Sequence, residues 1–185
     1  GDTSELFDIN AYVHESSATF ENTSFNNGGI GIYSYDSSID ATGNTFTGHS
    51  NYSLFLSSNT SGSVEHNTTT NTFIGSDPTG VSTGAPVSIY CNDSGTINSS
   101  GDTFQDVTAS YAFYTGNCNS EIEDATFTNI SGYSLYLSNG DHSIDNTTFS
   151  NVSTVSTYAP AMYFYASSPM NIAVSDVTIT DSLGD

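Results

Sequence analysis

The sequence predicts an all-β fold, a right-handed parallel β-helix of about seven coils with three short strands in each coil. Two observations carry this prediction. One short phrase recurs seven times along the 185 residues, and the apolar positions around it alternate with period 2 rather than 3.6. Short strands that repeat in this way bury their apolar side only by stacking on the next copy.

The repeated phrase places one large apolar residue between hydroxyl or amide residues, as in NTFTG at 44–48. The seven anchors, which we expect to form a core ladder, are Phe25, Phe46, Phe73, Phe104, Phe127, Phe149 and Ile179. Successive anchors are 21 to 31 residues apart, which is typical of a solenoid whose loops differ in length. Because side chains alternate along a strand, the neighbouring threonines should face outward.

Two further apolar elements accompany each anchor. The aliphatic residues upstream are Ala18, Ile39, Val64, Ile97, Ile122, Ile144 and Ile172. Alternating segments downstream begin near residues 29, 53, 86, 112, 134 and 161. These three elements predict a single domain over 1–185, with coils at roughly 1–33, 34–57, 58–90, 91–115, 116–138, 139–166 and 167–185.

The position two residues after each anchor predicts a corner of the coil. Its occupants are Asn27, Gly48, Gly75, Asp106, Asn129, Asn151 and Asp181. Glycine, asparagine and aspartate tolerate the left-handed backbone that a tight bend requires. Stacked asparagines there should also exchange amide hydrogen bonds along the axis.

Phrases of the form FxN or FxG, followed by strands such as GGIGIYS, resemble the repeats of right-handed parallel β-helices. Such repeats occur in pectin-lyase-like enzymes, in polymorphic outer-membrane proteins of bacteria and in adhesin-like or sheath proteins of methanogenic archaea. The resemblance covers residues 16 to 181 or so. The abundance of Ser, Thr and Asn is most similar to the surface-protein branch, which implies a structural role.

Charge limits the partners of the chain. It contains no Lys or Arg against 20 Asp plus Glu, which gives a formal net charge of -20. Without cations to neutralise phosphate, we expect no nucleic-acid partner and no binding to anionic lipid surfaces. No stretch approaches the ~20 apolar residues of a membrane span, so we expect no membrane insertion.

Some of the acids occupy related positions in the repeat. Asp40, Glu65, Glu123 and Asp145 each follow an upstream aliphatic residue, and Glu121 lies nearby. Stacked one coil apart, these five carboxylates could bind calcium, the only cofactor that we predict. The alternative is an acidic face that is neutralised by diffuse salt.

The same acids include the carboxylate pairs Asp40/Glu65 and Glu123/Asp145. Paired carboxylates hydrolyse glycosides when they flank the scissile bond. Polysaccharide lyases of this fold use Arg or Lys, which this chain lacks. We therefore expect no catalytic residue and no enzymatic activity, and a glycan-active hydrolase is only the third functional hypothesis.

The two cysteines, Cys91 and Cys118, each follow a downstream segment in successive coils. This placement predicts a disulfide between coils, and a disulfide indicates an oxidising, extracellular location. The histidines His14, His49 and His142, together with His66, share no metal-ligand spacing. We expect all four at the surface.

Aromatic residues mark an outward face of the downstream segments. They are Phe55, Tyr90, Tyr114, Tyr136 and Tyr163, with Tyr52, Tyr111 and Tyr133 at the start of their segments. A stacked tyrosine face could bind glycans or pack on a neighbouring subunit. Glycosylation sequons occur at Asn22, Asn51, Asn59, Asn67, Asn92, Asn98, Asn129, Asn146 and Asn151.

The first functional hypothesis is a structural, self-assembling extracellular protein, such as a filament, sheath or cell-wall subunit. Neither GDTSELFDINAYV at the start nor VTITDSLGD at the end reads as a polar cap, and uncapped coils offer open sheet edges. The partner would be the protein itself, end to end and laterally. The alternative is an adhesin-type stalk or carbohydrate-binding module. Ice binding through Thr-x-Thr pairs is a fourth hypothesis, although Asn26, Ile74 and Gln105 interrupt the array.

Overall fold

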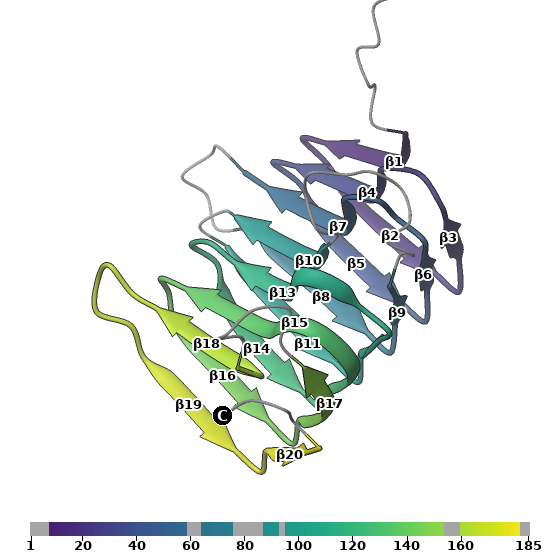
Figure 1. Cartoon of the computed structure of the whole chain (residues 1–185). Helices are drawn as coiled ribbons and strands as arrows, with labels where there is room; N and C mark the ends of the chain where they lie inside the picture. Colours follow the sequence, from purple (N-terminus) through teal and green to yellow (C-terminus); the bar gives the residue numbers. More distant parts are fainter. Residues whose placement is uncertain (1–7, 59–63, 76–86, 93–94, 154–159, 182–185) are drawn as a thin grey trace, which may run out of the picture.

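The protein is a right-handed parallel β-helix with three strands per coil, and it winds through about six turns. The structure is a computed structural model that describes residues 8–58, 64–75, 87–92, 95–153 and 160–181. Its strands lie in three columns along one axis, from the purple coil that holds β1 to the yellow coil that holds β20 (Figure 1). Within each column, every described strand pairs in parallel with the strand of the next coil, as predicted.

The first column contains β1 (Ile9–His14), β4 (Ile30–Tyr35), β7 (Tyr52–Ser57), β10 (Val87–Asn92), β13 (Thr108–Thr115), the second half of β15 (Thr126–Ser138) and β18 (Met162–Tyr165). The second contains β2 (Ser17–Glu21), β5 (Ser38–Thr42), β8 (Glu65–Thr69), β11 (Thr96–Ser100), β14 (Asn119–Glu123), β16 (His142–Asp145) and β19 (Ile172–Ser175). The third contains β3 (Ser24–Asn26), β6 (Thr45–Thr47), β9 (Thr72–Ile74), β12 (Thr103–Gln105), the first half of β15, β17 (Thr148–Ser153) and β20 (Thr178–Thr180).

The phenylalanine anchors form the core ladder that the sequence predicts. Phe25, Phe46, Phe73, Phe104, Phe127 and Phe149 stack with ring centroids 4.5 to 5.0 Å apart. From Phe46 to Phe149 these side chains have no exposed surface. Burying each one stabilises the fold by roughly 1.5 to 3 kcal/mol, which offsets the chain entropy of a sequence that is otherwise polar.

The seventh anchor, Ile179, pairs in register with Phe149 but is 48% exposed. The prediction of a buried ladder is therefore wrong at this position. The reason is geometric, because no further described coil lies beyond β20.

The predicted corner adopts the left-handed backbone at Asn27, Asp106, Asn129, Asn151 and Asp181, and at Gly48, but not at Gly75. Amides link it along the axis: Asn129 Nδ2 donates to Asp106 Oδ1 at 2.8 Å, and Asn151 Nδ2 donates to Asn129 Oδ1 at 2.7 Å. A second left-handed corner lies three residues before each anchor, at Asn22, Gly43, Thr70, Gly101, Asp124, Asn146 and Asp176.

A buried polar row lies between the second corner and the anchors. The Oδ1 atom of Asn71 accepts bonds from the backbone and side chain of Asn44 at 2.9 and 3.0 Å. In the same way Asp102 Oδ1 accepts from the backbone and side chain of Asn71 at 2.7 and 3.1 Å. Burial raises the pKa of Asp102, against the opposing effect of hydrogen bonds from Thr68, Ser99 and Asn71. This row satisfies backbone amides where the chain turns.

Within the described ranges no helix is present, and none therefore qualifies as a membrane-spanning helix. The surfaces that remain to be described are the three outer faces of the strand columns and the two end coils.

Candidate functional site

The outer surface divides into three faces of different chemistry. Among the described strands, every Asp and Glu lies in the second column, at Glu21, Asp40, Glu65, Glu121, Glu123 and Asp145. We call the outer side of this column the acidic face. The outer side of the third column, with Thr45, Thr72, Thr103, Thr126 and Thr148 in register, is the threonine face. The outer side of the first column is the aromatic face.

The aromatic face contains a continuous ladder of rings, one from each coil. Its members are Tyr12, Tyr33, Phe55, Tyr90, Tyr114, Tyr136 and Tyr163. Neighbouring centroids are 4.7 to 5.4 Å apart, and the planes from Phe55 to Tyr114 are within 10° of parallel. The predicted stack is confirmed from Phe55 to Tyr136. The row of rings extends two coils further toward the N-terminus, where Tyr33 meets Phe55 edge-on at 86° and Tyr12 is tilted by 60° against Tyr33.

Three more tyrosines flank the ladder. Tyr52, Tyr111 and Tyr133 cross ladder rings at steep angles, such as 63° between Tyr52 and Phe55 and 86° between Tyr133 and Tyr136. Each begins a motif of tyrosine, small residue, inward residue and ladder ring: YSLF at 52–55, YAFY at 111–114 and YSLY at 133–136. The small residues Ser53, Ala112 and Ser134 are buried, which gives the flanking rings room beside the ladder.

Five tyrosines of the aromatic face have a raised pKa. Desolvation is the main cause that raises the pKa of Tyr33, Tyr52, Tyr90, Tyr114 and Tyr136. Repulsion between neighbouring phenolates raises the pKa further for all of these except Tyr52. These five side chains are therefore uncharged near neutral pH.

The acids do not form the predicted column. In register, Asp40 pairs with Asn67, Asn67 with Asn98, and Asn98 with Glu121, whereas Glu65 pairs with Thr96. The prediction failed because it aligned Val64 with the aliphatic residues. The inward residue of β8 is His66, which pairs with Ile97.

Amides separate the carboxylates. Asn67 Nδ2 donates to Asp40 Oδ1 at 2.7 Å, and Asn98 Nδ2 donates to Glu65 Oε1 at 3.1 Å. Glu123 and Asp145 are adjacent in register, and the hydroxyl of Ser175 donates to Asp145. In the part of the chain that is described, no three His, Cys, Asp or Glu side chains are grouped closely enough to hold a metal ion.

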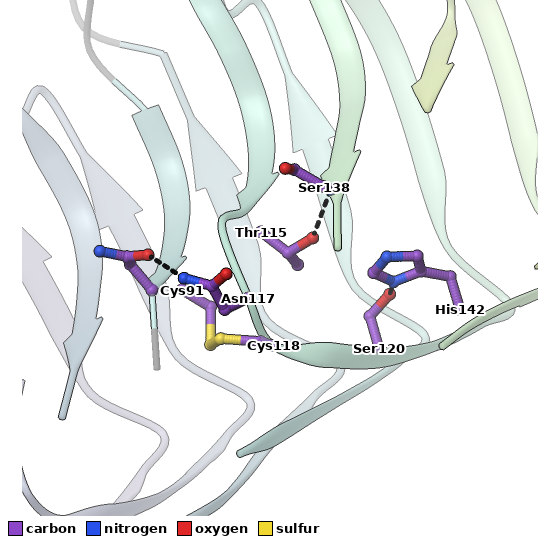
Figure 2. The surroundings of a disulfide bond; sticks show 8 residues. Cys91, Thr115, Asn117, Cys118, Ser120, Ser138 and His142 are labelled. Carbon is purple, nitrogen blue, oxygen red and sulfur yellow. Dashed lines mark hydrogen bonds between the residues drawn. A yellow bond between two sulfur atoms is a disulfide. The ribbon is translucent and has the colours of Figure 1, made fainter. Parts of the chain in front are cut away.

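The disulfide between Cys91 and Cys118 is confirmed. Its two Cα atoms are 6.2 Å apart, it closes a sequence separation of 27 residues, and both cysteines are fully buried. Figure 2 shows that it joins the coil of β10 to the start of the next coil, close to Ser120 and His142.

The prediction of surface histidines holds for His14 but is wrong for the other three. His49, His66 and His142 are between 1% and 3% exposed. His49 Nε2 is 3.0 Å from Asn10 Oδ1, and His142 Nδ1 is 2.9 Å from Ser120 Oγ. Burial lowers the pKa of His49 and of His142 to about 4 in each case. The rings of His49 and His142 are therefore neutral near pH 7.

Several sequons occupy structural positions. The side-chain amides of Asn67, Asn98, Asn129, Asn146 and Asn151 each donate to the preceding coil. Asn22 lies at a left-handed corner, Asn51 is half-buried, Asn92 is exposed, and Asn59 lies outside the described residues. Corner and strand chemistry thus accounts for much of the Asn-x-Ser/Thr pattern, and glycosylation stays a prediction.

The end coils carry the exposed apolar surface. Large exposed hydrophobic residues in the described ranges are Ile9 and Tyr12 in β1, Tyr165 in β18, Ile172 and Val174 in β19, and Ile179 in β20. The described residues of the intervening coils include none. Ile172, Val174 and Ile179 continue three inward rows of the core, so the last described coil presents a cross-section of that core.

Comparison with known proteins does not assign the chain to a family. No family model, curated protein or solved structure matches the chain. The functional argument therefore depends on the faces and ends of this molecule.

Proposed function

We propose that the protein is a structural, self-assembling extracellular subunit whose coils stack end to end with those of another copy. The observation that carries the proposal is the confinement of exposed large hydrophobic residues to the first and last described coils. Apolar surface at both ends of a solenoid is suited to contact with further coils. A head-to-tail contact that does not close generates filaments.

The two ends are compatible in backbone and side chains. Among the described strands, β1, β2 and β3 pair only with strands of the next coil, and β18, β19 and β20 pair only with strands of the previous coil. The outer edges of these two sets of strands are of the same parallel kind and are suited to pairing with one another. Continuing the repeat would place Ile172 over Ala18, Val174 over Phe20 and Ile179 over Phe25.

Net charge opposes the assembly and makes it salt-dependent. Each copy carries a formal charge of -20, so two copies repel until salt shortens the screening length, from ~30 Å at 0.01 M to ~3 Å at 1 M. The extracellular location is supported by the disulfide. The resemblance to surface and sheath proteins with β-helix repeats supports the same class.

The adhesin-type alternative has less support from the aromatic face. Sugars pack on open ring faces, but the ladder rings cover one another's faces at 4.7 to 5.4 Å. Ring faces are not covered in this way at the N-terminal end, where Tyr12 and Tyr33 meet at 60° and Tyr33 and Phe55 at 86°.

Electron microscopy and sedimentation velocity at 0.02, 0.15 and 1 M NaCl test the proposal. We expect polymers that lengthen with protein and salt concentration. Ile179→Asp with Val174→Asp should stop growth, because both side chains are already exposed and the change adds charge only at the end. Thr128→Asp, in a central coil, is the matched control and should polymerise. A wild-type protein that remains monomeric in all salts contradicts the proposal.

A further inference from the structure

The aromatic face has two properties that together select a partner. Its strands contain no Asp or Glu in a molecule of net charge -20, and their one ionisable group besides tyrosine is His14 at the N-terminal end of the face, which lies 3.7 Å from Glu15. The face also repeats once per coil over seven coils, with ring centroids 4.7 to 5.4 Å apart.

Charge determines which faces of two copies can approach. Bringing two acidic faces together places like charges opposite one another, which costs several kcal/mol. The aromatic and threonine faces avoid this cost. Of these two, the aromatic face offers the larger gain on burial, because tyrosine combines a large apolar ring with a hydroxyl that hydrogen-bonds at the rim.

The spacing of the ladder rings from one coil to the next determines which partner fits along the whole ladder. A rigid partner with another repeat length would lose register with the rings after a few coils. A second copy has the same coil spacing, so its rings meet this ladder in the same way at each coil. Two-fold symmetry, the commonest arrangement of homodimers, brings the same face of both copies together.

We propose that two copies of the chain pair laterally, with the aromatic ladder and its flanking tyrosines Tyr52, Tyr111 and Tyr133 packed against the same surface of the partner copy. The proposal rests on the proposed structural function and adds the lateral contact to it. End-to-end stacking then produces paired filaments rather than single ones. Tyr114, the fifth of the seven ladder rings, lies near the middle of the contact.

The test uses the full chain with its ends blocked by Ile179→Asp and Val174→Asp, so that only lateral association contributes to mass. Sedimentation equilibrium in 0.15 M NaCl should give twice the chain mass at high concentration. Tyr114→Glu adds a carboxylate to the face, and Ser57→Glu adds one beside the ladder without removing a ring. Each should weaken pairing by roughly tenfold or more, because like charges then meet across the contact. Thr126→Glu on the threonine face is the control and should pair like its parent.

Tyrosine fluorescence supplies a second measurement, since the chain has 12 Tyr and no Trp. Pairing should reduce quenching by acrylamide in the parent and the Thr126→Glu control, but not in Ser57→Glu. Circular dichroism verifies that each variant is folded. An end-blocked parent that stays monomeric, or pairing lost equally in Thr126→Glu and Ser57→Glu, overturns the proposal.

Other outcomes separate the two contacts and the competing partner. Unblocked chains that form single-file polymers retain the end contact and refute the lateral one. Unblocked chains that form pairs but no polymers retain the lateral contact and refute the end contact. If the end-blocked chain stays monomeric but a neutral soluble β-glucan protects its tyrosines from acrylamide, the face binds glycan and lateral pairing is rejected.

Discussion

Removal of the disulfide tests how far the coils depend on one covalent link. The bond closes a sequence separation of 27 residues between successive coils. The chain-entropy relation for a loop of this length gives ~3.5 kcal/mol of stabilisation at 25 °C. Replacing both cysteines by alanine also removes two buried sulfurs, so we expect Cys91→Ala with Cys118→Ala to lower the free energy of unfolding by at least ~3 kcal/mol.

Urea denaturation followed by circular dichroism measures this loss, with the oxidised wild type as reference. Thiol trapping adds a kinetic readout. Because both cysteines have no exposed surface, a water-soluble phosphine should reduce the bond in urea but hardly at all in buffer. A double variant within ~1 kcal/mol of the wild type, or equally fast reduction in buffer and in urea, would refute the reasoning.

Three further predictions concern the core. Phe104→Ala should cost ~3 to 5 kcal/mol in urea melts because it opens the centre of the ladder, whereas Ile179→Ala, at an exposed position, should cost much less. Asp102→Asn should stabilise the fold at pH 7. The raised pKa of Asp102 means that wild-type stability falls as pH rises above 3.8 through the folded value, and the variant should lack this loss when melts at several pH values are compared. For His49, the folded pKa of about 4 lies below the ordinary 6.5. Stability should therefore fall as pH drops from 6.5 to 4, by ~2 kcal/mol after allowance for solvent screening, and NMR should show the His49 ring titrating near its folded pKa of about 4.

The sequence was sufficient to predict the fold because one segment of each coil has fixed length. From seven residues before the anchor to two residues after it, the register holds through every coil, as Ala18 pairs with Ile39 and Phe25 with Phe46. Stacking requires this constancy, since a slip of one residue would turn the inward row outward. Length varies only between the corner two residues after the anchor and the second column of the next coil.

The inward rows of the second column could not be read from hydrophobicity alone. The residue seven positions before the anchor is His66 in one coil, Ser120 in another and His142 in the next. Choosing the nearest aliphatic residue in each coil aligned Val64 and Ile122 with Ile97, where the structure aligns His66 and Ser120. The acids that follow Val64 and Ile122 were therefore also predicted in the wrong register. Counting from the anchor would have placed the row correctly and would also have revealed the left-handed corner three residues before each anchor.

The placement of acids explains how a chain without cations can stack its coils at all. A column of identical carboxylates one coil apart would repel at every step, because each has two like neighbours. Here Asn67 follows Asp40 in the same register, and Asn67 and Asn98 donate to Asp40 and Glu65. Only Glu123 and Asp145 are adjacent carboxylates in register among the described strands of this face. Within the molecule the amides thus limit repulsion between acids, whereas no such amide pairing is built in between the acidic faces of two copies. This is why the proposed contacts between copies use the aromatic face and the end coils.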